Sequence, residues 1–199
     1  MQTNILALSS ALFNPSSLML IMENKATLRR KILKIRDSLS SENVSSLSTK
    51  ILERLFSRPM VIQSKKIAFY MPKGNEVDTR MMIYQAKSAG KEVLLPITKK
   101  ELEFHPFHSF ADLHEGKYGI LEPPESKPIE PEVIIVPGIS FGLCMHRLGY
   151  GKGYYDRYLS KSSAYRVGIC YDFQVVEKLP SHPHDQRLNE IVSEKRVII

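Results

Sequence analysis

The chain has little cysteine, and the two cysteines it has form no recognisable metal or redox pattern. Its 199 residues contain only Cys144 and Cys170. These two form no C-x-x-C pair, and no histidine–cysteine cluster has the spacing of zinc ligands. The pattern favours two reduced thiols in a cytoplasmic protein, with a disulfide between them as the alternative.

Long apolar runs, dense basic blocks and internal repeats are also absent. No apolar stretch reaches the roughly 20 residues that a bilayer-spanning helix needs, so we expect no membrane partner. The formal net charge of +7 suits anionic ligands such as nucleotides. The basic residues form no block and are not interleaved with aromatic residues, so we expect no nucleic-acid partner.

The first 22 residues differ from the rest in composition. They are apolar and serine-rich and contain no Lys or Arg. A secretory signal has a positive region before its apolar core, which this segment lacks. Pro15 would also interrupt a helix here. We therefore predict a disordered N-terminal extension over residues 1–22, followed by one domain over residues 23–199.

Hydrophobic periodicity in residues 23–199 predicts an α/β fold. Helical spacing of apolar residues predicts helices over 23–39, from Ser40 or Ser41 to 55, and over 77–89. Short apolar runs predict strands at 67–70, 91–95, 102–107, 132–136, 165–170 and 191–199, with an ordered loop over 116–131. Strands that alternate with helices pair in parallel. We expect a single-domain three-layer fold with a mostly parallel, Rossmann-like sheet flanked by helices.

Residues 136–159 are unusually rich in glycine and predict a strand end, a loop and the first turn of a helix. Three of these glycines alternate, at Gly149, Gly151 and Gly153. They match neither the G-x-G-x-x-G nor the P-loop pattern. Alternating glycines nevertheless let backbone N–H groups converge on a phosphate without side chains in the way. The stretch therefore predicts a phosphate-binding loop.

Charged residues beside the glycines support this prediction. Arg147 and Lys152 add positive charge, and Asp156 lies one turn into the following helix, where a carboxylate can hold Mg²⁺ against phosphate oxygens. The alternative is a tight turn in which Asp156 and Arg157 form a surface salt bridge.

Two earlier segments also carry candidate ligand-binding residues. Lys25 and Arg29 are four residues apart and share one helix face, from which they can reach a phosphate; a solvated surface is the alternative. Glu76 follows a predicted parallel strand, at the sheet edge where ligands bind in α/β proteins. It can equally be an acid that stabilises the start of the next helix.

The glycine-rich stretch, VPGISFGLCMHRLGYGKGYYDRYL, resembles the signature of the 5-formyltetrahydrofolate cyclo-ligase, or methenyltetrahydrofolate synthetase, family. Five further elements of that family occur in order, so the resemblance covers nearly all of residues 23–199. They are K-x-x-L-R at 25–29, Y-x-P with E-V-x-T at 70–79, G-K-x-V-x-x-P at 90–96, G-x-x-E-P at 119–123 and H-D at 184–185.

The resemblance implies an ATP-dependent ligase of one-carbon metabolism. The implied reaction cyclises 5-formyltetrahydrofolate to 5,10-methenyltetrahydrofolate and releases ADP and phosphate. ATP phosphorylates the formyl oxygen, and N10 then attacks the activated carbon. The implied ligands are reduced folate, ATP and Mg²⁺, bound by a cytoplasmic monomer. Phosphoryl transfer needs positioning and charge neutralisation rather than a nucleophilic side chain.

The resemblance also implies roles for individual residues. Those implied for ATP are Lys25, Arg29, Arg147, Gly149, Gly151, Lys152, Gly153, Tyr154 and Tyr155, with Arg147 and Lys152 as catalytic residues. Those implied for the folate are Tyr70, Glu76, Phe141 and Tyr154, where each aromatic residue has plain core packing as its alternative. Those implied for Mg²⁺ are Asp156 and Asp185.

Four positions depart from the family pattern. Gly142 stands where an Asp is usual, Met145 where a Gly is usual, His182 where an acid is common and Asn189 where an Asp is frequent. Loss of the loop carboxylate can weaken ligand binding, or it can be neutral if that residue only shapes a turn. The second interpretation is therefore a non-catalytic or weakly active relative that binds folate or nucleotide.

Overall fold

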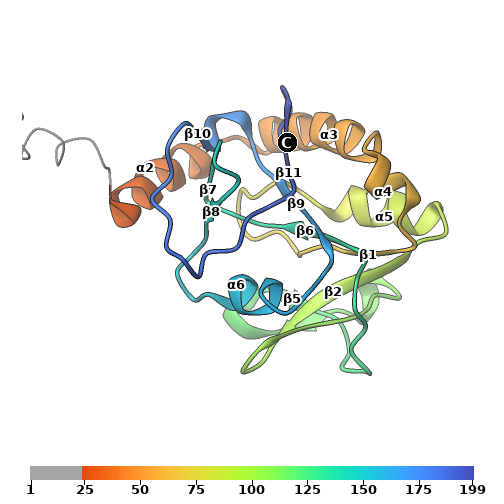
Figure 1. Ribbon diagram of the computed structural model, residues 1–199. Coiled ribbons are helices and arrows are strands. Elements are labelled where there is room, and N and C mark those ends of the chain that lie inside the picture. The colour runs from red at the N-terminus through yellow and green to blue at the C-terminus, as the bar shows by residue number, and fades with distance from the viewer. Residues whose placement is uncertain (1–23) are drawn as a thin grey trace, which may run out of the picture.

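The computed structural model describes residues 24–199, so the prediction for residues 1–22 lies outside the described part of the chain. A seven-stranded sheet, in the order β12-β11-β9-β6-β1-β2-β3, forms its centre (Figure 1). Its strands are β1 (Lys66–Ala68), β2 (Glu92–Thr98), β3 (Leu102–Pro106), β6 (Val133–Val136), β9 (Tyr165–Ile169), β11 (Glu190–Val192) and β12 (Val197–Ile198). The five inner strands run parallel, and the edge strands β3 and β12 pair antiparallel.

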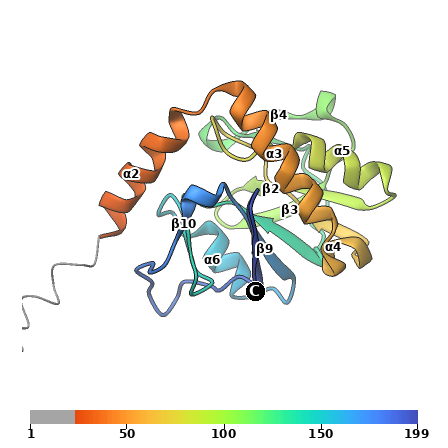
Figure 2. The ribbon, with the colours of Figure 1, turned by 90° about the horizontal axis from the view of Figure 1, so that it is seen from above.

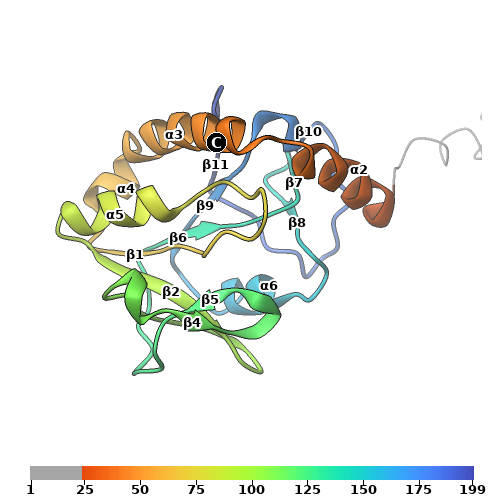
Figure 3. The same cartoon turned by 180° about the vertical axis from the view of Figure 1, so that it is seen from behind.

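Helices cover both faces of this sheet, so the predicted three-layer, mostly parallel fold is confirmed. The helices are α2 (Lys25–Asp37), α3 (Ser41–Phe56), α4 (Pro59–Gln63), α5 (Arg80–Ser88) and α6 (Tyr154–Leu159). Helices α3, α4 and α5 lie on one face and α6 on the other (Figures 1 and 3). None of the helices in residues 24–199 is long and apolar enough to cross a bilayer.

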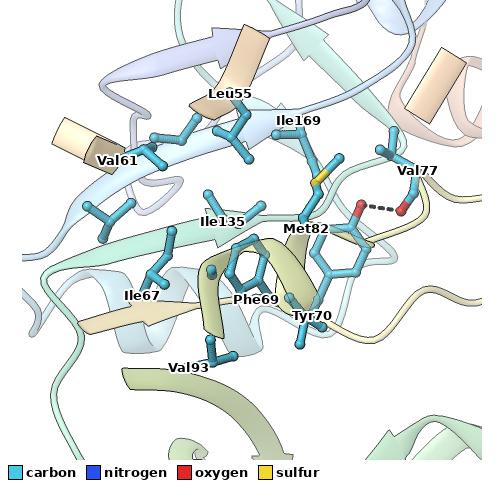
Figure 4. Close-up of a cluster of buried hydrophobic side chains, with 14 of the residues drawn as sticks. Leu55, Val61, Ile67, Phe69, Tyr70, Val77, Met82, Val93, Ile135 and Ile169 are labelled. Carbon is cyan, nitrogen blue, oxygen red and sulfur yellow. Dashed lines mark hydrogen bonds between the residues drawn. The ribbon is translucent and has the colours of Figure 1, made fainter. Parts of the chain in front are cut away.

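Two hydrophobic clusters fill the space between the layers. The first joins Leu55 of α3 and Met82 of α5 to sheet residues such as Ile67 and Ile135 (Figure 4). The second joins Leu159 of α6 to the opposite sheet face. The inner strands are buried on both faces, which explains why β6 reads as an unbroken apolar run, with all four residues buried.

Helix α2 lies to one side of this three-layer body, as the view from above shows (Figure 2). It packs on a small three-stranded sheet made of β7 (Ser140–Gly142), β8 (Arg147–Leu148) and β10 (Val175–Val176). The contact is apolar and joins Leu28, Ile32, Ile139, Leu148 and Leu179. The hairpin of β7 and β8 was not predicted: it lies between the end of β6 and the glycine-rich loop.

Other elements are short and lie in the connections. They are β4 (His114–Glu115), β5 (Leu121–Glu122) and the 3₁₀ turns η1 (Phe110–Asp112), η2 (Lys117–Gly119) and η3 (Asp172–Gln174). Strands β4 and β5 pair as a hairpin inside the segment predicted as a connecting loop. Both cysteines are free thiols, as predicted.

Two element boundaries differ from the prediction for identifiable reasons. Helix α5 begins at Arg80 rather than at residue 77, and Asn75, which precedes it, does not cap it. Instead the Asn75 amide donates to the carbonyls of Arg36 and Leu39, at the end of α2. Strand β2 continues past Pro96, because its pairing with β1 stops at Leu94 while its pairing with β3 does not need the missing N–H.

Ile135→Ala tests the first core cluster. Ile135 is fully buried in β6, so the truncation leaves a cavity and should lower the free energy of unfolding by about 2–5 kcal/mol in urea denaturation. The matched change Ile62→Ala, at a side chain that is 58% exposed, should cost about 0.5 kcal/mol or less. Equal losses in the two variants would contradict the assignment of this core.

Candidate active site

A cleft of about 870 Å³ opens where β1, β2 and β6 end at their carboxyl edges. Residues that directly follow β1 and β6, including Tyr70, Glu76 and Gly138, line one wall. Helix α2, the glycine loop and the start of α6 line the other walls, together with Asp185 from the C-terminal part of the chain. The cleft therefore lies at the sheet edge where ligands bind in parallel α/β folds.

The glycine loop, residues 149–153, presents unpaired backbone donors to this cleft. Its N–H groups donate to no acceptor in the described part of the chain. Gly151 and Gly153 have φ angles of +91° and +67°, which disfavour any side chain at these positions. A Cβ at Gly153 would also lie 2.9 Å from Arg157 Nη1. The loop thus keeps a conformation in which several N–H groups remain available to an anion.

Of the two α2 cations that the sequence singled out, Arg29 contacts this loop and Lys25 contacts Asp185. The Arg29 Nε donates to the Gly149 carbonyl at 2.8 Å. The Lys25 Nζ donates to Asp185 Oδ2 at 2.7 Å. These contacts join parts of the chain 120 and 160 residues apart. Both cations line the cleft, and Arg29 lies directly beside the loop.

The two cations predicted on the loop itself occupy different environments. Arg147 is buried, and its Nη1 lies 3.1 Å from Asp156 Oδ1. Lys152 is exposed at the loop and pairs with no described carboxylate. The alternative of a surface salt bridge between Asp156 and Arg157 is wrong, because Arg157 instead donates to the Lys152 carbonyl at 2.9 Å.

The two predicted metal ligands both line the cleft, and each is partly engaged. Asp156 Oδ1 accepts the Gln186 N–H at 3.0 Å, and Asp185 Oδ2 accepts the His182 N–H at 2.8 Å. The other oxygen of each carboxylate accepts no described hydrogen bond. Residues 24–199 hold no group of three or more potential ligands. Since Mg²⁺ commonly takes only one or two protein carboxylates beside phosphate oxygens and water, these two residues fit such a site.

Glu76 lines the same cleft, in a polar cluster that is almost closed to water. It is 8% exposed, and its Oε2 accepts the Lys73 N–H at 3.0 Å while Oε1 accepts the Tyr150 hydroxyl at 3.0 Å. Burial raises the pKa of Glu76, although the Lys73 N–H and the charge of Arg36 act in the opposite direction. Because α5 begins four residues later, at Arg80, Glu76 is not the helix-start acid of the alternative prediction.

The predicted aromatic residues divide between cleft and core. Tyr70, Tyr154 and Tyr155 line the cleft, and the buried Tyr155 hydroxyl has no hydrogen-bond partner in the described part of the chain. Tyr70 donates to the Val77 carbonyl at 3.0 Å, as Figure 4 shows. The prediction that Phe141 stacks on a folate is wrong: Phe141 is fully buried in the second core cluster and packs against Gly138.

Two residues of the site were missed from the sequence. Arg36 was given no role from the sequence, yet it is 3% exposed and lines the cleft. Its spacing carried a signal, because positions 25, 29 and 36 fall on one stripe of an α-helix. Tyr150 gave no comparable signal, since nothing in the glycine pattern distinguishes a residue that reaches across the cleft.

Three of the four departures from the family pattern lie outside the cleft lining. Gly142 is buried in β7, where a Cβ would lie 2.7 Å from the Leu179 Cβ. Met145 is buried with a φ of +67°, a conformation that favours glycine. Asn189 accepts the Arg166 N–H at 2.9 Å. His182 alone of the four lines the cleft, so the departures mainly concern turns and packing.

Comparison with known proteins gives a consistent family match. The model of the 5-formyltetrahydrofolate cyclo-ligase family matches residues 21–194. A probable 5-formyltetrahydrofolate cyclo-ligase from Schizosaccharomyces pombe is 33% identical, over 87% of this chain and 95% of its own length. The 5-formyltetrahydrofolate cyclo-ligase of Escherichia coli is 30% identical, over 81% of this chain and 96% of its own length.

Solved structures give the same result. The 5,10-methenyltetrahydrofolate synthetase of Aquifex aeolicus superposes with a TM-score of 0.79 and 40% identity, over 87% of this chain and 91% of that one. The 5,10-methenyltetrahydrofolate synthetase of Mycoplasma pneumoniae gives a TM-score of 0.70 and 29% identity, over 86% of this chain and 99% of that one.

Asp185→Asn tests the ion pair with Lys25. Burial acts to raise the pKa of Asp185, but the hydrogen bonds from Lys25 and from the His182 N–H outweigh it and lower that pKa below 3.8. A depressed folded-state pKa stabilises the fold above the unfolded value, and this stabilisation is lost as the pH falls through the folded value. We expect Asp185→Asn to cost about 1 kcal/mol in urea denaturation at neutral pH.

The cost should shrink as the pH is lowered below 3.8, the unfolded value. Asp112→Asn, at an exposed residue, serves as the control and should change stability little at any pH. A cost for Asp185→Asn that stays the same in acid would show that the ion pair does not provide the stability.

Proposed function

The chain belongs to the 5-formyltetrahydrofolate cyclo-ligase family, and we propose that its cleft is where it carries out the ATP-dependent cyclisation of 5-formyltetrahydrofolate to 5,10-methenyltetrahydrofolate. One observation supports this location above the others. A single cleft holds unpaired backbone donors with cations, and also a buried carboxylate. The first suits a polyphosphate, and the second suits a ring that offers N–H donors.

The nucleotide side is formed by the glycine loop and α2. The N–H groups of residues 149–153 would bind phosphate oxygens, with Lys25, Arg29 and Lys152 neutralising their charge. Arg147 keeps Asp156 in place through its 3.1 Å ion pair and adds positive charge behind the loop. Donors fixed by the fold need no reorganisation when charge develops during phosphoryl transfer. We assign Tyr154 and Tyr155 to the nucleotide side because they follow the loop directly.

We propose Asp156 and Asp185 as the residues that would hold Mg²⁺, each through the oxygen that accepts no described hydrogen bond. The ion would supply neutralisation of the phosphate charge. Lys25 holds Asp185 at 2.7 Å, and Arg147 holds Asp156. The protein therefore positions both carboxylates before any ligand arrives.

The folate side centres on Glu76. A pterin ring presents an amino group and a ring N–H, and the Glu76 carboxylate can accept hydrogen bonds from both. Tyr70 and Tyr154 line the same cleft and offer ring surfaces beside it. Since Glu76 is buried, a hydrogen bond to it is stronger than one made in water. This side therefore supplies orientation and recognition.

The reaction then needs few protein groups. The formyl oxygen attacks the terminal phosphorus of ATP and ADP departs. N10 attacks the formyl carbon, the carbon–oxygen bond to the transferred phosphate breaks, and N10 loses its proton. The protein holds the two substrates in one closed space and stabilises the charge on the phosphoryl group, which is the main contribution enzymes make to such transfers.

We further propose that residues 23–199 form one catalytic domain that works as a monomer in the cytoplasm, with small molecules as its ligands and no nucleic-acid or membrane partner. Every cleft residue named above comes from one chain.

Purified protein with Mg²⁺ and ATP should convert 5-formyltetrahydrofolate into a product that absorbs in the near ultraviolet. Omission of ATP, or chelation of the metal, should abolish the absorbance change. Calorimetry on the same sample measures the binding of ATP and of the folate separately from turnover. Binding of both ligands without product would support the non-catalytic relative and contradict the proposed function.

Glu76→Gln and Arg29→Met should each raise the KM for a different substrate. Loss of one hydrogen bond to a charged group weakens binding by about tenfold. We therefore expect Glu76→Gln to raise the KM for the folate about tenfold with little change for ATP, and Arg29→Met to do the reverse. Steady-state kinetics with each substrate varied in turn measures both. If either variant raises both KM values equally, the division of the cleft into two sides is wrong.

A further inference from the structure

Arg36 is a buried cation whose hydrogen-bonding capacity is only partly used. It lies in the last turn of α2 and its side chain is 4% exposed. Its Nη2 donates to the Tyr150 hydroxyl at 2.7 Å, and its Nη1 lies 3.6 Å from Glu76 Oε1. Its Nε and Nη1 are buried and have no hydrogen-bond partner in the described part of the chain.

Stability alone does not require this arrangement: burial disfavours the Arg36 cation, and although the Tyr150 hydroxyl and the nearby carboxylates raise its pKa, two of its nitrogens still lack an acceptor in the described part of the chain. A buried guanidinium loses its hydration, and an ion pair at 3.6 Å without a hydrogen bond recovers only part of that loss. A leucine at position 36 would fill this buried space without leaving an unsatisfied N–H group. The position of Arg36 therefore suggests a role in the site rather than in the core.

Tyr150 connects this cation to the carboxylate by a directed pair of hydrogen bonds. Its hydroxyl accepts from Arg36 and donates to Glu76 Oε1 at 3.0 Å. A hydroxyl has one proton, so accepting from the cation fixes its donation toward the carboxylate. The Asn75 amide, one residue before Glu76, also donates to the Arg36 carbonyl at 3.1 Å. Side chain and backbone together tie Glu76 to the end of α2.

We propose that Arg36, acting with Tyr150, is a positioning residue that keeps the Glu76 carboxylate ionised and oriented to receive the pterin ring. This inference rests on the proposed function, because it assumes that Glu76 binds the folate. In this role Arg36 acts on the substrate only through Glu76.

The electrostatic surroundings of Glu76 support this role. Burial favours the neutral acid, so opposing groups are needed to keep Glu76 charged near neutral pH. Arg36 is a full positive charge beside it, Lys73 supplies a backbone N–H and a more distant charge, and Tyr150 supplies a hydroxyl. The titratable and charged groups facing Glu76 from all packed elements are Arg36, Tyr70, Lys73, Tyr150, Tyr155 and Tyr171.

Because α2 carries Arg36 as well as Lys25 and Arg29, one helix contacts both sides of the cleft. Tyr150 likewise belongs to the glycine loop but bonds to the folate-side carboxylate. Arg36 and Tyr150, which position Glu76, therefore both come from elements assigned to nucleotide binding, α2 and the glycine loop. Its geometry depends on the same docking of α2 that forms the nucleotide side.

The test compares the pH dependence of kcat/KM for 5-formyltetrahydrofolate in wild type, Arg36→Met and Arg36→Lys. An opposite charge within a few ångströms lowers a carboxylate pKa by at least about one unit. Without that charge, Glu76 should take up its proton at higher pH. We expect the acid limb of the profile to move up by about one pH unit in Arg36→Met, with about a tenfold higher folate KM on that limb. Arg36→Lys should restore most of the shift.

Arg58→Met is the matched control, because Arg58 pairs with the buried Glu190 at 2.8 Å on β11, outside the cleft. It should lower the Tm without moving the pH profile. Tyr150→Phe, which keeps the ring but removes the hydroxyl, should move the acid limb in the same direction as Arg36→Met. If Arg36→Met lowers only the Tm, as Arg58→Met does, Arg36 is structural and the inference is wrong.

A second measurement separates this inference from the proposed function. The Glu76 carboxyl can be titrated by ¹³C NMR in the free protein, with its signal identified by its loss in Glu76→Gln. The titration should move to higher pH in Arg36→Met whether or not the protein turns over. An unmoved titration overturns the inference, whereas absent turnover with a moved titration overturns only the proposed function.

Discussion

The docking of helix α2 against the glycine loop is the interaction on which the cleft depends. Arg29 reaches the Gly149 carbonyl and Lys25 reaches Asp185, while Leu28 and Ile32 pack on the small sheet beneath. Helix α2 lies to one side of the central sheet, so these contacts, not the main core, fix its position (Figure 2). Without them the cleft would lose one wall, the two α2 cations of the nucleotide side and the cation beside Glu76.

The glycine loop imposes the complementary constraint. Its positive φ angles at Gly151 and Gly153 exclude most side chains, and its N–H groups remain without acceptors in the described part of the chain. A loop that satisfied its own donors would fold more stably but would have nothing to offer a phosphate. The loop therefore depends on contacts at its margins. Arg29 holds it at Gly149, and Arg157 holds it at the Lys152 carbonyl.

Much of the fold was predictable because burial leaves a periodic trace in the sequence. The inner strands read as apolar runs, and Ser40 caps α3 as predicted, by accepting the Asn43 N–H. The wrongly predicted boundaries have another cause: each depends on a contact with a segment that is distant in sequence. Asn75 looks like a cap for the helix that follows it, but it serves the end of α2. Pro96 looks like a strand stop, but β3 pairs with β2 beyond it.

Within the site, too, some residues were predictable from the sequence and others depended on the packing of the folded chain. Lys25, Arg29, Asp156 and Asp185 were predicted as ligand residues, and all four line one cleft, because motif order and strand polarity together decide which segments meet. Phe141 was assigned to the folate because it belongs to the same signature, but its ring fills the core against Gly138. A signature marks positions where substitution is costly and does not separate packing from chemistry. Gly142 and Met145, where the chain departs from the family pattern, are also packing positions.

Arg36 shows the converse case. It was given no role from the sequence, although it shares a helix face with Lys25 and Arg29. The burial of its guanidinium between Tyr150 and Glu76 distinguishes it from those cations. The fold buries this cation with two nitrogens that have no partner in the described part of the chain, which packing alone does not require, so we explain it by what it does to the group beside it. That group is the carboxylate at the centre of the folate side. The departures in the signature concern turns and packing, whereas the charge that governs Glu76 lies outside the signature, on a helix held in place by the glycine loop.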